Sequence, residues 1–159
     1  MSTKRITYSE GEWFAIPLSR GDYGLGLIVR GSYRTKGGLG YFFGPRYASL
    51  PKIDLTAPMT PNNAVLVAWF GDYAIINGRW PLLESSFVFK RGNWPVPDFK
   101  RPDFANPNFG WLVEYDQENP IFSDPKRLTY LPINQISSLP EEGQLGYRAL
   151  EIQLSRLLL

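Results

Sequence analysis

The sequence of 159 residues contains neither cysteine nor histidine. Without cysteine the chain can form no disulfide and has no thiol nucleophile, and this composition fits a reducing compartment. Without histidine it also lacks the commonest general base and the commonest transition-metal ligand. Catalysis would therefore have to use carboxylate, lysine, tyrosine or serine side chains, and we predict no cofactor and no metal site.

The sequence also lacks long hydrophobic runs and a strong charge of one sign. Its longest apolar run, 64–70, is far shorter than the roughly 20 residues of a membrane-spanning helix. The first residues, 1–6, have no apolar core of the kind found in a signal peptide. The formal net charge is only +2, which gives no electrostatic reason to expect a nucleic-acid or membrane partner. These features predict a soluble, cytoplasmic protein that does not bind membranes.

Proline and glycine, in contrast, are abundant. The 14 prolines and 15 glycines argue against a mainly helical protein and favour short strands joined by many turns. Gly24 and Gly26 lie inside a predicted strand, where glycine marks a strong bend such as a small barrel needs. We therefore predict an α+β, mainly β fold: a small, strongly bent antiparallel sheet or an SH3-like partial barrel, with a C-terminal helix packed on it.

The length fits a single domain over 1–159. Apolar alternation and turn signals predict strands at 13–18, 23–30, 39–43, 65–70, 72–76, 86–90, 110–116 and 127–133. The other segments are predicted as a loose lead over 1–10, a helical turn near Ile53, an extended proline-rich segment over 93–109 and a helix over 138–159. The prediction of the C-terminal helix rests on a capping box at Ser138–Glu141 and on leucines at helical spacing. Gly143 and Gly146 weaken its first turn, so the stable part of the helix is predicted to start near Leu145.

Two tryptophan–proline pairs, Trp80-Pro81 and Trp94-Pro95, follow the longest apolar run. Each proline restricts the preceding tryptophan to an extended conformation, so each ring enters its segment at a fixed angle. We interpret both rings as anchors of the β core. The alternative is that one of them is a partly exposed interaction hot spot, a role in which tryptophan is enriched.

Carboxylates are the main candidates for chemistry. Asp72 with Glu84, or Asp98 with Asp103, are conceivable acid–base pairs. Nothing in their spacing brings the members of either pair together, and carboxylates are mostly exposed surface or turn residues. We therefore predict that the protein is not an enzyme.

The segment 34–47 combines cations, glycines and aromatic residues. Aromatic side chains on a sheet can stack on the bases of single-stranded RNA. This pattern suggests an alternative nucleic-acid or small-ligand site, with the candidate residues Arg34, Lys36, Tyr41, Phe43 and Arg46. The small net charge makes nucleic acid an unlikely partner, because a basic patch is the first requirement. Core aromatic residues are the competing interpretation.

Two stretches of the sequence together resemble the immunity protein 26 family. GEWFAIPL at 11–18, followed by DYGLG at 22–26, resembles the opening of that family, and FGD at 70–72 with NGRWP at 77–81 resembles its middle block. The resemblance covers roughly 11–116. It implies a non-enzymatic bacterial immunity protein that binds a cognate toxin domain and neutralises it by covering the active site or substrate path. It implies no catalytic residues.

Immunity proteins directed against nucleases often present carboxylates to a basic cleft. The resemblance therefore directs attention to the stretch 98–124, which is rich in carboxylates although Lys100, Arg101, Lys126 and Arg127 dilute its charge. The predicted toxin-binding residues are Asp98, Asp103, Asp116, Glu118 and Asp124, together with Trp94 as the possible hot spot. The sequence predicts neither the identity of the toxin nor the oligomeric state.

Overall fold

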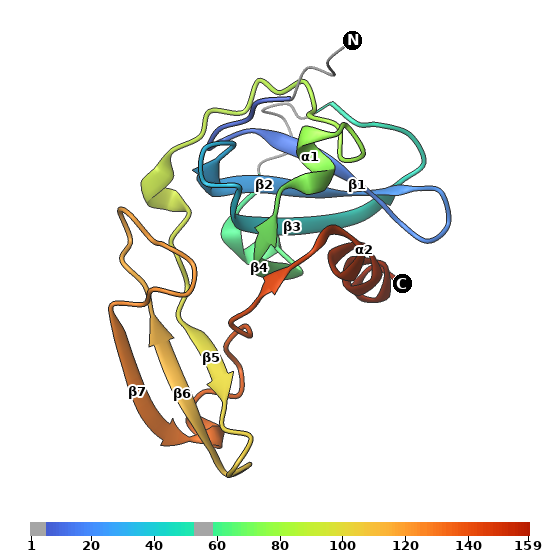
Figure 1. Ribbon diagram of the computed structural model, residues 1–159. Helices are drawn as coiled ribbons and strands as arrows, with labels where there is room; N and C mark the ends of the chain where they lie inside the picture. Colours follow the sequence, from blue (N-terminus) through green and yellow to red (C-terminus); the bar gives the residue numbers. More distant parts are fainter. Residues whose placement is uncertain (1–5, 53–58) are drawn as a thin grey trace. The chain divides into compact units, whose positions relative to one another are not determined.

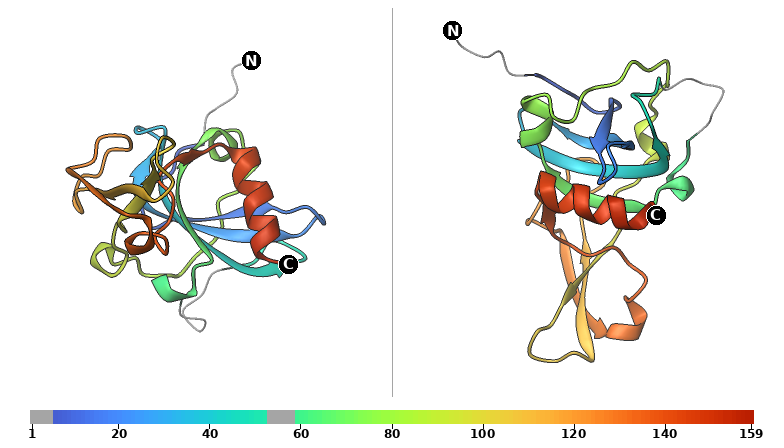
Figure 2. Two further views of the ribbon diagram at one scale, coloured as in Figure 1. Left: turned by 90° about the horizontal axis from the view of Figure 1, so that it is seen from below. Right: turned by 90° about the vertical axis from the view of Figure 1, so that its right-hand side faces the viewer.

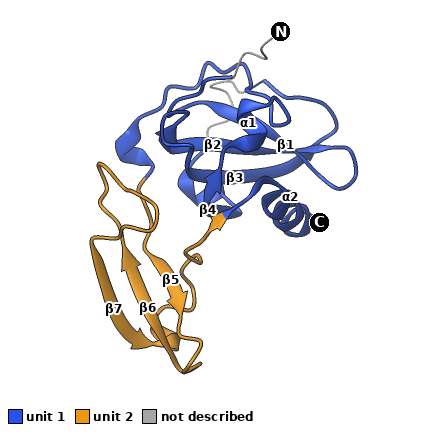
Figure 3. Ribbon diagram, viewed as in Figure 1, with its two compact units in different colours: residues 1–94, 145–159 blue, residues 95–144 orange. Residues whose placement is uncertain are grey.

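A computed structural model describes residues 6–52 and 59–159 of the chain (Figure 1). The chain divides into two compact units: unit 1 comprises 1–94 and 145–159, and unit 2 comprises 95–144 (Figure 3). Compactness does not test whether the units fold independently, so the single domain over 1–159 stays a prediction. No helix in the described ranges is long and apolar enough to cross a membrane.

Unit 1 is built on a five-stranded sheet with the order β1-β2-β3-β4-β8. The strands of this sheet are β1 (Trp13–Pro17), β2 (Tyr23–Ser32), β3 (Gly37–Tyr47), β4 (Leu66–Gly71) and β8 (Gln144–Leu145), and of β8 only Leu145 belongs to unit 1. The first four strands pair in antiparallel fashion with their neighbours. The register between β2 and β3 shifts twice, between Tyr23 and Leu25 and between Ile28 and Arg30. Such irregularities bend a strand and increase its twist, which accounts for the curvature of this sheet.

Large aromatic rings cover both faces of this sheet. On one face, Phe14 stacks on Trp80 with a centroid separation of 5.6 Å and also contacts Phe70. On the other face, Trp94 meets Tyr41 and Phe43 edge-on, with centroids 5.2 Å and 6.0 Å apart. Side chains alternate between the two faces of a strand, so neighbouring positions in one strand contribute to opposite ring clusters. Trp80 is 0% and Trp94 2% exposed, as expected of core anchors.

The described residues of unit 1 include two α-helices. The short helix α1 (Tyr73–Ile76) directly follows β4, and the C-terminal helix α2 (Tyr147–Leu157) packs against β4 (Figure 2). Leu150 and Leu154 of α2 are fully buried in the cluster that contains Phe14 and Trp80. A Cβ atom on Gly24 would collide with the Leu154 side chain, so this glycine permits close approach of the helix to the sheet. Together with the bent sheet, this packing confirms the predicted mainly β fold with a C-terminal helix, and the described residues form no closed barrel.

Unit 2 contains a three-stranded antiparallel sheet with the order β5-β6-β7. Its strands are β5 (Phe99–Pro102), β6 (Phe109–Glu114) and β7 (Arg127–Pro132). Gly110 of β6 lies under Ile136, and a Cβ atom at this glycine would approach the Ile136 side chain to 3.0 Å. The segment that follows β7 therefore covers one face of the sheet. On the opposite face, Trp111 lies between Arg101 and Tyr130 across the three strands.

The predicted strands 13–18, 23–30, 39–43, 65–70, 110–116 and 127–133 are confirmed with small shifts at their ends. The predicted strand 72–76 is wrong, because these residues form α1. The Asp72 carbonyl oxygen accepts hydrogen bonds from the amides of Ile75 and Ile76, and Gly78, with φ of +86°, ends the helical turn. The apolar residues of this segment are buried as the pattern indicates, but Ala74 and Ile75 are buried by one turn of helix and not by a strand.

Two further expectations differ from the structure. The predicted strand 86–90 is wrong: Phe87 packs on Trp13 from irregular backbone. The capping box predicted at Ser138–Glu141 does not start a helix, because Lys100 of β5 donates its amide to Pro140 and accepts a hydrogen bond from the Glu142 amide. Backbone that pairs with a strand in this way cannot make helical bonds, and α2 begins only at Tyr147.

The extended segment 93–109 starts at the last residue of the 3₁₀ turn Arg91–Asn93 and contains β5, so part of it is a regular strand. Within the predicted loose lead, Tyr8 is only 2% exposed and its hydroxyl group hydrogen-bonds to Asp72. Residues 1–5 of that lead and the helical turn predicted near Ile53 lie outside the described residues.

Candidate functional site

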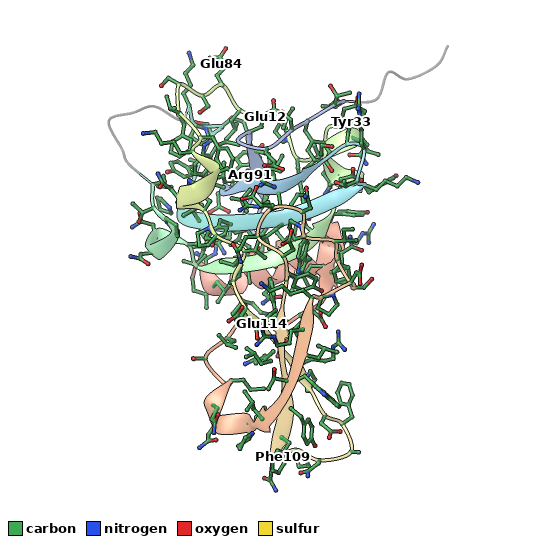
Figure 4. The ribbon with its side chains drawn as sticks, turned by 90° about the vertical axis from the view of Figure 1, so that its left-hand side faces the viewer. Glu12, Tyr33, Glu84, Arg91, Phe109 and Glu114 are labelled. Atoms are coloured by element: carbon green, nitrogen blue, oxygen red, sulfur yellow. The ribbon has the colours of Figure 1, made fainter. Side chains whose placement is uncertain are left out.

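The predicted toxin-binding carboxylates lie in unit 2, at the two ends of its sheet. Asp98 immediately precedes β5, and Asp116 follows β6 by two residues. Because β5 and β6 are antiparallel, both positions fall at the same end of the sheet as Glu114, whereas Asp103 falls at the end of Phe109 (Figure 4). Five residue steps along an extended strand separate Asp98 from Asp103 by about 16 Å. The structure therefore does not make one patch of all five carboxylates.

We call the end that carries Asp98 and the connection 115–126 the acidic end. Glu118 and Asp124 lie in this connection with Asp116, and all three residues are exposed. Asp116 accepts a 2.7 Å hydrogen bond from the amide of Asn119 through Oδ2. Ile121 is 62% exposed in the same connection. The acidic end thus displays an apolar side chain that is flanked in the sequence by carboxylates.

The connection 115–126 is fixed from within unit 2 at two points. The Tyr115 hydroxyl group donates to Glu142 Oε2 (2.6 Å) and accepts a hydrogen bond from the Ser123 amide (3.1 Å). The Gln117 amide group bonds to both backbone groups of Val96, accepting from its N–H (2.9 Å) and donating to its carbonyl oxygen (2.7 Å). Fixed anchors of this kind reduce the entropy that a loop loses when a partner binds.

The first anchor rests on a buried carboxylate. The Glu142 side chain is 8% exposed, and the Arg101 guanidinium group donates to its Oε1 at 2.6 Å. A buried charge is tolerated when it is both paired and hydrogen-bonded, and Glu142 meets both conditions through Arg101 and Tyr115. Burial, followed by the hydrogen bond to Glu142, raises the pKa of Tyr115, so the phenol remains a donor throughout the physiological range.

Like charge accumulates at the acidic end. The pKa of Asp98 is raised, first by partial burial and then by the neighbouring negative charge of Glu114, whereas Lys126 lowers it. The Arg127 guanidinium group lies 3.9 Å from Glu114 and is largely exposed, so solvent screens this pair. Glu114 therefore adds a fifth negative charge to the four predicted carboxylates at this end, although it was not among the predicted site residues.

Asp103, at the opposite end of the sheet, belongs to a different arrangement. Its Oδ2 accepts a 2.5 Å hydrogen bond from the Tyr130 hydroxyl group, which is the first cause of its lowered pKa. Tyr130 stacks on Phe109 with a centroid separation of 5.2 Å and also contacts Trp111. Asp103 therefore lies next to a half-exposed row of aromatic rings and not next to other carboxylates.

The remaining predicted site residues lie in unit 1. Trp94 is buried, so a partner reaches its ring only by displacing the rings around it. In the alternative nucleic-acid site, Tyr41 is 4% and Phe43 0% exposed, which leaves neither ring free to stack on a base. Arg34 and Lys36 are exposed at the turn between β2 and β3. The structure therefore does not assemble this set into one exposed surface.

Arg46, the last member of that alternative set, stabilises the C-terminal end of α2. Its guanidinium group donates to the carbonyl oxygens of Leu158 (2.6 Å) and Ser155 (2.8 Å) and pairs with Asp22 at 2.9 Å. A cation at this end satisfies carbonyl groups that the helix leaves without partners.

The carboxylates considered for acid–base chemistry also have separate partners. Asp72 accepts a hydrogen bond from buried Tyr8, and exposed Glu84 lies 3.3 Å from the exposed Lys52 ammonium group. Within residues 6–52 and 59–159, no group of three or more acidic side chains is arranged to hold a metal ion.

The sequence analysis missed Glu142, Tyr115 and Gln117 as parts of the site. Glu142 resembles any surface acid in the sequence, because the partners that bury it lie 27 and 41 residues away. The one local signal is that Tyr115 lies in the predicted strand 110–116, and this pattern does not indicate the hydrogen bonds of its hydroxyl group.

The comparison with known families gives a match for the model of immunity protein 26 over residues 9–111. This span covers more than half of the chain and agrees with the resemblance expected over 11–116. It includes Asp98 and Asp103, whereas Asp116, Glu118 and Asp124 lie beyond it. No curated protein and no solved structure matches the chain.

Proposed function

The chain belongs to the immunity protein 26 family, and from this premise we propose that it binds a cognate bacterial toxin domain and neutralises it without catalysis. In this proposal the protein acts in the bacterial cytoplasm and covers the active site or substrate path of the toxin. The observation that carries the proposal is the acidic end of unit 2, where exposed carboxylates stand on a connection held by Tyr115 and Gln117.

The composition of the acidic end suits a basic cleft. Complementary charge accelerates association and fixes the register of a complex, and Asp116, Glu118 and Asp124 supply that charge. Ile121 supplies an apolar contact that can fill a pocket on the partner, as interface anchors do. The anchored backbone supports tight binding, because little conformational entropy remains to be lost.

The test is co-purification and titration with the toxin-like domain encoded by the neighbouring reading frame. The triple variant Asp116→Lys, Glu118→Lys, Asp124→Lys reverses the charge of the acidic end and is expected to weaken binding at least tenfold. Since steering by charge is screened by salt, the difference from the unchanged protein should shrink as the ionic strength rises.

Asp103→Lys is the matched control, because it reverses an exposed carboxylate of the same unit at the other end of the sheet. It is expected to change the affinity less than threefold. Unchanged affinity of the triple variant would contradict the assignment of the acidic end. Failure of the unchanged protein to bind the neighbouring toxin domain would contradict the function itself.

A further inference from the structure

A small cavity in unit 1 contains a buried carboxylate that the proposed function does not use. The cavity has a volume of about 210 Å³ and is lined by Ile6, Tyr33, Lys36, Asp72, Tyr73 and Ile76. Asp72, which joins β4 to α1, is only 8% exposed. We call this cavity the Asp72 pocket.

Three segments far apart in the sequence form the pocket. Ile6 closes one side, where its amide donates to the carbonyl oxygen of Ile76 (3.3 Å). The turn between β2 and β3 supplies Tyr33 (Figure 4) and Lys36, and the amide of Tyr33 donates to the carbonyl oxygen of Tyr8. Helix α1 supplies Tyr73 and Ile76. Backbone hydrogen bonds therefore hold these segments together around the pocket.

The charge of Asp72 is incompletely compensated. Its Oδ2 accepts a 2.7 Å hydrogen bond from the neutral Tyr8 hydroxyl group, whereas Oδ1 has no hydrogen-bond partner and the carboxylate no ion pair among the described residues. Burial raises the pKa of Tyr8, as do the hydrogen bond and the charge of Asp72, so Tyr8 remains a neutral donor. A buried carboxylate is costly unless a cation pairs with it. Lys36 also lines the pocket but forms no ion pair with Asp72, so the carboxylate has no cationic partner among the described residues.

The walls select the kind of cation. Tyr33 is 42% and Tyr73 60% exposed, and aromatic faces attract ammonium and guanidinium groups. The Arg34 guanidinium group already lies 5.6 Å from the Tyr33 ring centroid, and Tyr147 contacts the Tyr73 ring, so a ligand uses the exposed parts of these rings. Two isoleucines provide apolar surface for an aliphatic stem. A bare metal ion would find only one carboxylate, whereas an organic cation can use the rings and the isoleucines as well.

We propose that the Asp72 pocket binds a lysine or arginine side chain of a protein partner. The cavity is smaller than the roughly 300–1,000 Å³ occupied by drug-sized ligands, and it suits a single side chain. The inference rests on the proposed function for the origin of that side chain, which belongs to the toxin domain. It adds to the acidic end a second contact that recognises positive charge.

The first experiment measures the pocket without the toxin. The full ¹⁵N-labelled chain is titrated with N-acetyl-arginine amide, N-acetyl-lysine amide and the neutral N-acetyl-norleucine amide, and amide shifts are followed at Lys36, Asp72 and Tyr73. The two cations are expected to shift these signals with dissociation constants on the order of millimolar, and norleucine amide is expected to leave them unchanged. Equal binding of norleucine amide would overturn the proposal.

Variants then assign the binding to individual side chains. Asp72→Asn keeps the shape and an acceptor for Tyr8 and is expected to weaken cation binding at least tenfold. Glu84→Gln removes an exposed carboxylate of unit 1 that lines neither the pocket nor the acidic end, and it is expected to leave cation binding unchanged. Tyr73→Ala changes an exposed ring, so it keeps the test decisive if Asp72→Asn does not fold, and it is expected to weaken binding about threefold.

Lys36→Met is expected to strengthen cation binding, whereas Asp72→Asn and Tyr73→Ala are expected to weaken it. Lys36 lines the same pocket, and its positive charge opposes a cationic ligand, so the variant is expected to bind N-acetyl-arginine amide two- to fivefold more tightly. If folded Asp72→Asn retains cation binding, or if Tyr73→Ala does not weaken it, the proposal is wrong.

The source of the cation is tested separately. The peptide Gly-Gly-Arg-Gly-Gly is expected to bind more tightly than n-butylammonium, and Asp72→Asn is expected to weaken the toxin complex at least tenfold. Tighter binding of n-butylammonium, or unchanged toxin affinity of Asp72→Asn, would overturn the assignment to a protein side chain. If the probes fail while the toxin still binds, the pocket is wrong and the proposed function stands.

Discussion

The hydroxyl group of Tyr115 donates a 2.6 Å hydrogen bond to Glu142, although 27 residues separate the two in the sequence. The same hydroxyl group accepts a hydrogen bond from the Ser123 amide. Tyr115 therefore joins the connection that carries the exposed carboxylates to the segment that follows β7. The geometry of the acidic end depends on this one oxygen atom and on the Gln117 amide group.

Tyr115→Phe is expected to lower the free energy of unfolding by about 1–3 kcal/mol, because Glu142 loses a donor and the Ser123 amide loses its acceptor. Urea unfolding measures the loss, and hydrogen exchange at Ser123 should accelerate. Tyr130→Phe is the control, since it removes a hydroxyl group from a half-exposed ring. A smaller loss for Tyr115→Phe than for Tyr130→Phe would contradict the anchoring role.

Arg46→Met is expected to destabilise the protein by about 1.5–3 kcal/mol, because it removes charged hydrogen bonds to the last carbonyl groups of α2. Amide exchange in the last turn of α2 should accelerate more than exchange in the sheet. Arg34→Met removes an exposed arginine from the turn between β2 and β3 and is expected to leave stability unchanged. Similar effects of the two substitutions would rule out the capping role of Arg46.

Asp98 and Asp103 are expected to change the pH dependence of stability in opposite directions. The folded state raises the pKa of Asp98 through burial and Glu114, so its contribution becomes unfavourable as the pH rises from the ordinary carboxyl pKa of 3.8 through the folded value. The hydrogen bond from Tyr130 lowers the pKa of Asp103, so its contribution is favourable above the ordinary pKa and disappears as the pH falls through the folded value.

The corresponding measurement is urea unfolding of Asp98→Asn and Asp103→Asn near neutral pH and in strong acid. Near neutral pH, Asp98→Asn should be more stable than the unchanged protein and Asp103→Asn less stable. Both differences should shrink as the pH falls below the ordinary carboxyl pKa, because the carboxyl groups become protonated in both states. Equal signs near neutral pH would show that charge and hydrogen bonding do not distinguish the two ends of the sheet.

The local spacing of apolar residues predicted much of the fold, because this spacing indicates which side chains are buried. The apolar run at 64–70 led directly to β4, and the Trp80 and Trp94 anchors are buried as expected. The same pattern failed at 72–76, where one turn of helix buries Ala74 and Ile75 as effectively as a strand would. It failed again at Ser138–Glu141, because pairing with Lys100 competes with helix formation. In both cases the error concerns the hydrogen-bond partner of the backbone. Short-range periodicity gives no information about that partner.

The sequence by itself determined the mainly β fold, the two buried tryptophans, the lack of thiol and imidazole chemistry and the resemblance to the immunity family. Each of these follows from residue types and from spacings within a few positions. Tertiary structure alone decided that Asp98 and Asp103 lie at opposite ends of a sheet, that Glu142 lies beneath Tyr115, and that Asp72 faces a cavity between two tyrosines. The physical reason is that strand register and chain reversal, rather than composition, bring charges together across long stretches of sequence.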